Sequence, residues 1–335
     1  MDFVVVRPSL RPLALATSFS LALAATDLAT SPAAAEPTGF PRGKAADLAV
    51  MQVSLKDAVP FSWGFQGQTQ GAGTPNAIGI GGFLPLSVRA NSVLFLDALV
   101  NVNLPDIDRS SSIINTEVVG TTLSTSTRLG YRWFNDDRSW WFGLTTGYDS
   151  RPMATGQPDT GIAVTNPQTV FFQQLAAGLE AVSDSWSLHA YALVPVGTTN
   201  AQLNSVYQGG ALETYGLDVG YAITPDIRFS LGYYYQDGDI GTADGSGVLG
   251  KLAYRISSGL TLAANLSYDQ AFDTRVSADL NYRFGSRGDA APARPPSAVM
   301  QALSAPPGNR DVRVADGVTW NPRGEMASGG VCSDC

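Results

Sequence analysis

The chain has 335 residues, a formal net charge of -8 and only 15% charged residues, against a usual charged share of about 25%. The acidic balance argues against a nucleic-acid partner, because phosphate binding needs a basic surface. The single histidine, His189, and the two cysteines, Cys332 and Cys335, exclude a disulfide scaffold, a site of two histidines and a zinc site of several thiolates, so no cofactor is expected.

An export signal is predicted at the N-terminus. Positive charge at Arg7 and Arg11 precedes an apolar core from Pro12 to Ala25, and small residues before Glu36 offer a cleavage site. The apolar core is shorter than the roughly 20 residues of a spanning helix. We therefore expect a signal peptide over 1–35 and a short periplasmic segment over 36–60.

Alternation of apolar and polar residues, in runs of about ten, continues from there to residue 285. In "VSADLNYRFG" (276–285) the alternation has no fault up to Phe284, and a period of two is the pattern of a strand with two different faces. Twelve strands are predicted in chain order, at about 61–67, 77–84, 91–103, 120–134, 140–150, 169–183, 186–197, 210–224, 227–236, 247–257, 260–270 and 275–284.

The predicted connections are sorted by length. Tight turns at 135–139, 184–185, 224–226 and 258–259 alternate with long loops at 104–119, 151–168, 198–209 and 237–246, and only 271–274 breaks the rule. Short periplasmic turns and long outer loops are typical of outer-membrane barrels. The fold class predicted is all-β: an up-and-down, antiparallel, transmembrane β-barrel of twelve strands over 61–285. A secreted β-sandwich or soluble barrel would explain the alternation, but not an apolar face combined with sorted loops.

Aromatic residues gather at the strand ends, where amphipathic rings settle at membrane interfaces. They are Tyr131, Trp133, Phe134, Trp140, Trp141, Trp186, Tyr233 to Tyr235, Tyr282 and Phe284. The opposite face carries charges that suit a wet lumen. These are Asp97, Arg128, Arg132, Asp149, Glu180, Asp218, Arg228, Lys251, Arg255, Asp269, Arg275, Asp279 and Arg283. Two compatible roles are open for them: bracing the wall, or creating a field that selects solutes.

Four segments in fixed order resemble the translocator barrel of inverse autotransporters, the intimin and invasin family. They are "FLPL" (Phe83–Leu86), Ser92–Val102, "TRLGYRWFNDDRSWWFGLTTGYDS" (Thr127–Ser150) and Phe171–Gly197. The resemblance implies a twelve-stranded barrel whose chain turns back through the lumen after the last strand to display a passenger. The 51 residues after Phe284 are fewer than one Ig-like domain of about 100, so a reduced passenger is expected.

The C-terminal residues decide between the functional alternatives. Tyr282 and Phe284 resemble the terminal signal read by the barrel assembly machinery, yet a Pro/Ala-rich segment, predicted flexible, follows over 286–335. Crossing ~30 Å of membrane takes on the order of 10 extended residues, so this tail is long enough to thread the lumen. Cys332 and Cys335 can form a disulfide there.

The first hypothesis is a monomeric translocator-like barrel in the outer membrane, surrounded by outer-membrane lipid, with an unknown surface ligand for its tail. The second is a small porin with a charged lumen. The third and least favoured is a barrel hydrolase using His189 and Ser187, because catalysis by histidine needs an orienting carboxylate and a nucleophile within about 3 Å. An enzyme is therefore not expected.

Overall fold

The computed structural model describes residues 55–107, 109–158, 163–240, 244–257, 259–285 and 298–318. They belong to one compact unit, Val50–Cys335. The predicted signal peptide, nearly all of the expected periplasmic segment, and Cys332 and Cys335 lie outside the described residues. Within the described ranges no helix is both long enough and apolar enough to cross a membrane.

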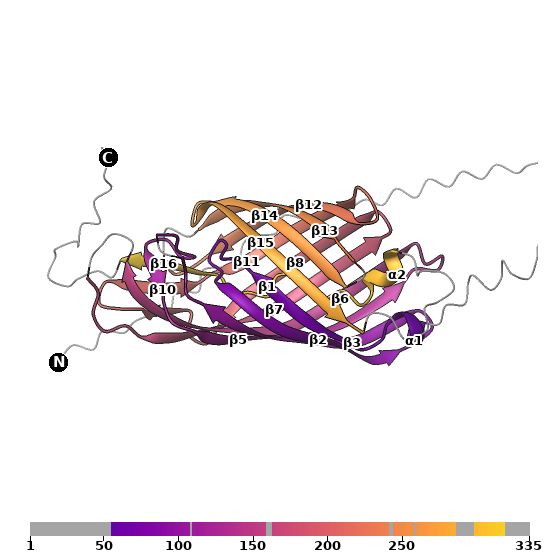
Figure 1. The fold of residues 1–335 in the computed structure, drawn as a ribbon, viewed down its shortest axis with the longest axis horizontal. Helices are drawn as coiled ribbons and strands as arrows, with labels where there is room; N and C mark the ends of the chain where they lie inside the picture. Colours follow the sequence, from indigo (N-terminus) through magenta and orange to yellow (C-terminus); the bar gives the residue numbers. More distant parts are fainter. Residues whose placement is uncertain are drawn as a thin grey trace, which may run out of the picture. The chain divides into compact units, whose positions relative to one another are not determined.

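Twelve of the described strands form one closed antiparallel barrel, as predicted (Figure 1). Each strand pairs with the barrel strands before and after it, and β1 pairs with β15 to close the sheet. The barrel strands are β1 (Ser62–Gln68), β2 (Asn76–Val88), β3 (Ser92–Leu104), β5 (Thr122–Phe134), β6 (Trp140–Pro158), β7 (Thr169–Ser183), β8 (Trp186–Val196), β11 (Glu213–Ala222), β12 (Ile227–Asp237), β13 (Gly245–Arg255), β14 (Leu260–Asp269) and β15 (Asp273–Phe284).

Two strands and two loops differ from the prediction. β2 continues through Pro85, where a bulge before Ser87 accommodates a residue that has no N–H for the ladder. β6 extends to Pro158 because its far end pairs with β4 (Thr116–Val118) and with the start of β7. Two expected loops also contain strands, namely β4 itself and the pair β9 (Asn200–Gln202) and β10 (Tyr207–Ala211).

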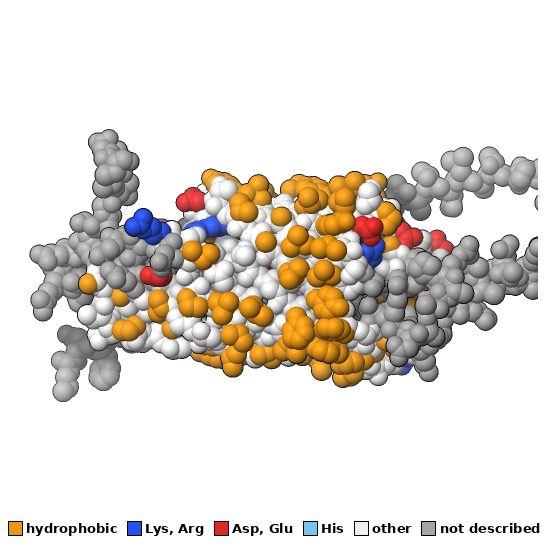
Figure 2. Space-filling model, viewed as in Figure 1, with side chains coloured by type: hydrophobic (Ala, Val, Ile, Leu, Met, Phe, Trp, Pro, Cys, Tyr) orange, Lys and Arg blue, Asp and Glu red, His pale blue; other side chains and the backbone are white. Residues whose placement is uncertain are grey.

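The two faces of the barrel wall have opposite chemistry. On β5, Leu129 is 44% exposed on the outside while Arg128, its neighbour, is 2% exposed on the inside. Outward apolar side chains cover the barrel, and charged side chains lie toward its ends (Figure 2). An 11-residue strand such as β8, tilted by about 40°, spans about 28 Å, close to the hydrocarbon thickness of a bilayer. The closed sheet and its apolar belt place the chain in the outer membrane.

Short connections such as 135–139 and 184–185 lie at one end of the barrel, which we call the turn end, and long ones such as 105–121 lie at the other, the loop end. At the turn end the closing seam is aromatic on its outer side. Trp63 stacks on Phe284 at 4.6 Å, and Tyr282 contacts Phe284 edge to face. Phe134, Trp141 and Tyr234, expected at the membrane interface, instead point inward and are 6%, 2% and 2% exposed, because their positions have the inward parity of β5, β6 and β12.

Part of the C-terminal segment is folded, whereas the sequence predicts a flexible tail. Residues 298–318, called the plug below, begin with α2 (Ala298–Ala302) near the turn end and finish in β16 (Val314–Val318) at the loop end (Figure 1). Short-range sequence patterns could not reveal this order, because apolar clusters between the plug and distant strands stabilise it. One cluster joins α1 (Leu55–Ala58) and α2 to the barrel, and two others surround β16.

Candidate functional site

The turn end of the lumen is closed by apolar packing. Val299 and Leu303 of the plug pack among Phe95 and Trp141 of the wall. The indole Nε1 of Trp141 donates to the carbonyl oxygen of Val299 at 3.0 Å, and the Val299 N–H donates to Asp184 at 2.8 Å. The inward tryptophan therefore fixes the point at which the plug enters the barrel.

Arginine side chains of β5 and β6 bind the plug through its backbone. Arg132 Nη1 donates to the carbonyl oxygens of Leu303 and Ala305, at 2.6 and 2.8 Å. Arg128 Nη2 donates to the carbonyl oxygen of Asn309 at 3.0 Å, and Arg151 Nη1 donates to that of Val312 at 2.9 Å. An extended segment in a lumen has no neighbouring strand for its carbonyl groups, and buried backbone groups need partners. The wall guanidinium groups supply them.

Carboxylates of the same wall hold these arginines in place. Arg132 pairs with Glu180 through two bonds, at 2.8 and 3.0 Å, and lies between the rings of Phe95 and Trp141. Arg128 pairs with Asp149 in the same bidentate way, at 2.6 and 2.8 Å. Bidentate pairing fixes the plane of a guanidinium group as well as its position. These predicted lumen charges therefore brace the wall and also bind the plug.

The plug carries charges of its own, which pair with the wall. Arg310 forms an ion pair with Asp97 and donates through Nε to Ser126 at 2.8 Å. Arg313 lies 3.4 Å from Asp269 and 4.4 Å from the ring centre of Tyr234. The inward tyrosine thus serves the plug and not the membrane interface.

At the loop end β16 extends a small sheet outside the barrel strands. It pairs with β10 from Tyr207 to Ala211, and β9 pairs with the other edge of β10. Asp316 accepts hydrogen bonds from the N–H groups of Ile114 and Asn115, at 2.9 and 3.1 Å, and from the Thr116 hydroxyl. Burial raises the pKa of the Asp316 carboxyl, although these hydrogen bonds oppose the rise.

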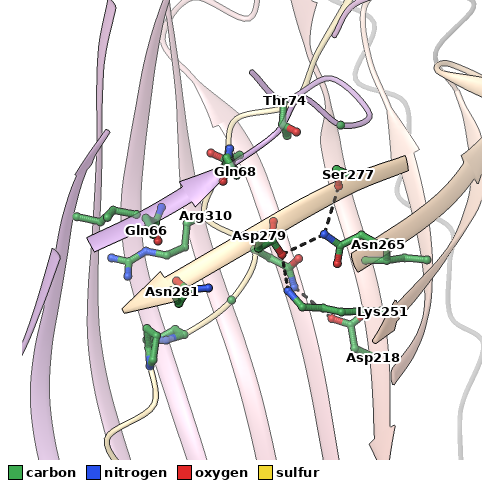
Figure 3. Close-up of a pocket in the computed structure, with 18 of the residues that line it drawn as sticks. Gln66, Gln68, Thr74, Asp218, Lys251, Asn265, Ser277, Asp279, Asn281 and Arg310 are labelled. Atoms are coloured by element: carbon green, nitrogen blue, oxygen red, sulfur yellow. Dashed lines mark hydrogen bonds and ion pairs between the residues drawn. The ribbon is translucent and has the colours of Figure 1, made fainter. Parts of the chain in front are cut away.

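A polar cavity of 460 Å³ remains between the plug and the opposite wall. Lys251, Asp279 and Asn265 line it on one side, and Arg310 of the plug also contributes to the lining (Figure 3). Lys251 pairs with Asp279 at 2.7 Å, and the Asn265 amide donates to the same carboxylate at 3.0 Å. The lumen is therefore filled on the β5–β6 side and open on the β13–β15 side.

Three other predicted lumen residues have contacts of their own. Arg283 lies 3.5 Å from Asp97, and Arg255 binds Asp226 and Gln301 near the turn end. Arg275 donates to the carbonyl oxygen of Phe272 at 2.9 Å.

The proposed hydrolase pair is not brought together by the described contacts. Ser187 accepts from Arg228 at 3.1 Å, whereas His189 lies 3.8 Å from Asp218. The base thus has an orienting carboxylate, but the serine is engaged elsewhere.

Sequence reasoning missed the plug residues that meet these charges, namely Asn309, Arg310, Arg313 and Asp316. The nearest sequence signal is "VRVADGV" (312–318), which alternates over Val312, Arg313 and Val314 but loses the alternation at Ala315 and Asp316. A single run of seven residues inside a Pro/Ala-rich segment was too little to outweigh the composition.

No family model matches the chain, and no curated protein matches it. A structure solved in work on the in-meso crystallization of membrane proteins is similar, with a TM-score of 0.52 and 10% sequence identity, over 77% of this chain and 100% of that one. The β-domain of the Bordetella autotransporter BrkA aligns with a TM-score of 0.30 and 12% identity, over 68% and 99% of the two chains. Outer membrane phospholipase A from Escherichia coli aligns with a TM-score of 0.35 and 12% identity, over 70% of this chain and 99% of that one. The first similarity supports the barrel fold; at these identities none of the three indicates an activity.

Proposed function

We propose that this chain is a translocator-type outer-membrane barrel, of the inverse autotransporter kind that its sequence resembles. In this proposal the chain crosses the lumen from the turn end to the loop end and delivers the residues beyond Val318 to the outside. The observation that carries the proposal is the course of the plug, from the Trp141 contact at the turn end to the β10–β16 pairing at the loop end.

The direction of this course agrees with outer-membrane topology. Short turns face the periplasm in such barrels and long loops face outward. β15 ends at Phe284 beside the turn-end seam, so the last strand leaves the chain on the periplasmic side. The plug then has to pass the lumen to reach β10.

The size of the barrel sets the form in which a passenger could cross. Eight strands nearly fill a barrel and sixteen leave an aqueous channel, so twelve leave a space suited to an extended chain and too small for a folded domain. Between α2 and β16 the plug has neither helix nor strand, and its carbonyl groups bind side chains of the wall. That is the state expected of a polypeptide arrested in transit.

Labelling of Cys335 on intact cells tests the proposal. With Cys332→Ser present and after reduction, an impermeant thiol reagent should label Cys335 without disrupting the outer membrane. Asp136→Cys in a short turn and Gln168→Cys in a long loop, each in a chain lacking both native cysteines, calibrate the two sides. Labelling of Cys335 only after rupture, like that of the Asp136→Cys control, would contradict outward delivery.

A small porin is the second candidate, favoured by the 460 Å³ cavity with charges of both signs. Conductance in a planar bilayer separates the two functions. The translocator proposal expects a nearly silent full-length barrel and clear channels from a chain ending at Gly285, provided that the shortened barrel keeps its heat-modifiable mobility on gels. Steady ion-selective channels from the full-length protein would favour the porin.

A further inference from the structure

The barrel wall is incomplete where β1 ends near the loop end. β1 has seven residues, whereas each of the other barrel strands has at least ten. Its pairing with β15 stops at Gln68 and Asp279, and one further contact follows, from the Thr69 N–H to the carbonyl oxygen of Ala278 at 2.9 Å. From there β15 reaches on to Asp273 with no described strand beside it on this side.

The chain that follows β1 turns into the lumen and does not continue the wall. Ala72 is buried. The carbonyl oxygen of Gly73 accepts from Arg151 of β6 and, at 3.4 Å, from the N–H of Val314 in the plug. Residues 70–75 therefore bind the plug and leave the wall open where a longer β1 would lie.

An apolar cleft of 480 Å³ lies on the outer surface at this point. The ladder places Gly67 between Ile78 of β2 and Leu280 of β15, whose side chains point outward. A Cβ added to Gly67 would meet one described atom within 4 Å, the carbonyl oxygen of Ala77 at 4.0 Å. The flanking side chains stand on strands two spacings apart, about 10 Å, which leaves room for one alkyl chain. Leu104, Ile107 and Leu262 add to the apolar lining.

This outer cleft adjoins the polar lumen cavity. Gly67, Gln68, Thr69 and Asp279 line both. The Asp279 side chain points into the lumen, where it pairs with Lys251 at 2.7 Å (Figure 3). An amphiphile in the membrane therefore has an apolar site for its chain and a polar site for its head on the two sides of these four residues.

The side chains on this side of the lumen suit an uncharged head group. Most of them are amides and hydroxyls, which both donate and accept hydrogen bonds, as the hydroxyl groups of a sugar do. They include Gln66, Gln68, Asn265, Ser277 and Asn281 (Figure 3). A volume of 460 Å³ is within the range of small-molecule sites.

The cations of the cavity are already engaged by carboxylates. Lys251 pairs with Asp279, Arg283 and Arg310 both lie against Asp97, and Arg313 lies against Asp269. A carboxylate or phosphate head would have to compete with these groups for a cation, whereas a hydroxyl group would not. The charges of the cavity thus disfavour an anionic amphiphile.

We propose that this opening binds a single-chain amphiphile with an uncharged, hydroxyl-rich head, such as an alkyl glycoside. The alkyl chain lies in the outer cleft against Ile78 and Leu280, and the head enters the lumen sideways and hydrogen-bonds beside Gln68 and Asn265. The site depends on the short β1 and on the wall around it. It stands whether or not the chain is delivered outward.

Photolabelling of the full-length protein in lipid nanodiscs tests this, with a dodecyl glucoside that carries a diazirine at the end of its chain. Labelling of β1, β2 and β15 should exceed that of the reference strands β11 and β12 about tenfold, and excess octyl glucoside should abolish the difference. Gly67→Leu fills the cleft and should reduce labelling to the reference level. Gly82→Leu is the matched control, because Gly82 is an outward glycine of β2 whose added Cβ would make ordinary contacts, the nearest at 3.4 Å; it should leave labelling unchanged.

Further variants and probes separate the chain from the head. Leu280→Trp narrows the cleft from β15 and replaces Gly67→Leu if that variant loses the heat-modifiable mobility of a folded barrel. Asn265→Ala should reduce labelling about fivefold, the effect of one lost hydrogen bond. Diazirine-bearing dodecanoate, dodecyltrimethylammonium and phospholipid should label all strands to a similar extent.

Three results would overturn the proposal. Even labelling of all strands by the glucoside would mean that there is no site, and enrichment that survives both Gly67→Leu and Leu280→Trp would place it elsewhere. Equal enrichment by the phospholipid would identify the occupant as ordinary boundary lipid, and equal enrichment by either charged probe would show that the lumen does not select an uncharged head.

Discussion

Arg310 offers the sharpest test of how the plug is held. Replacing it with methionine preserves length and apolar packing but removes the ion pair to Asp97 and the bonds to Ser126. Hydrogen bonds to charged groups contribute about 1.5–3 kcal/mol each. Arg283 still lies 3.5 Å from Asp97, which reduces the penalty of leaving that carboxylate buried. We expect plug docking to weaken by about 2–3 kcal/mol, a factor of about 30 to 150.

Hydrogen exchange of the β16 amides measures this docking, because those amides are protected by β10 and exchange when the plug opens locally. Arg310→Met should speed their exchange about 30- to 150-fold while leaving the β12 amides unchanged. Arg138→Met is the matched control, since the described contacts of the Arg138 side chain are with the neighbouring turn at Ala90 and Asn91, and surface contacts of this kind contribute little.

A double-mutant cycle separates the pair from the rest of the site. Asp97→Asn with Arg310→Met should weaken docking by less than the sum of the single changes, with a coupling of about 1–2 kcal/mol. Two results with Arg310→Met would refute the reasoning. One is a hydrogen-exchange rate of the β16 amides within twofold of that in the unmodified protein, and the other is an equal acceleration of exchange in the β12 amides. The first result would mean that the ion pair does not hold the plug, and the second that the barrel opens as a whole.

Three further predictions concern other parts of the molecule. Phe284→Ala removes the ring stacked on Trp63 and should lower the barrel's unfolding free energy by about 1–2 kcal/mol, measured by urea denaturation in lipid vesicles. Trp141→Phe removes the indole bond to Val299 and should speed exchange of the α2 amides by about fivefold, since one buried hydrogen bond contributes about 1 kcal/mol. The raised pKa of Asp316 means that the docked plug binds a proton more tightly at this carboxyl than the undocked plug does. Lowering the pH from 7 toward 4 should therefore slow hydrogen exchange of the β16 amides, after correction for the intrinsic rate. Asp316→Asn should flatten that dependence.

The barrel could be predicted because its pattern is local. Inward and outward residues alternate along each strand, so neighbours such as Arg128 and Leu129 identify the two faces without knowledge of any partner strand. Short turns and long loops can likewise be identified from a few residues each. The sequence therefore predicts twelve strands, their faces and their membrane. The added strands β4, β9 and β10 escape it because each has only three to five residues, and β4 and β10 also pair with strands far along the chain.

The partners of the lumen charges could not be predicted for the same reason. Alternation places Asp97 on the inner face, but its ion pair is with Arg310, which follows it by 213 residues in the chain. Asp316 meets Thr116 across 200 residues. Composition, too, was misleading for the plug. Proline and alanine are frequent in flexible segments, yet here Val299, Leu303 and Val314 enter apolar clusters that only the closed barrel creates.

Two kinds of ionic and hydrogen-bonding contact join the arginines and carboxylates to the plug, and they imply different roles under the proposed function. Arg132, Arg128 and Arg151 bind backbone carbonyl groups, which every peptide offers, so the β5–β6 wall can hold any extended segment that passes. The pairs of Arg310 with Asp97 and of Arg313 with Asp269 depend on particular side chains of the plug. A passing chain would therefore slide along the arginines and stop only when its own charges meet these carboxylates. On this argument, moving "NRDVR" (309–313) by a few residues along the tail should move the arrest point with it, while the contacts of the arginines are made again by other carbonyl groups.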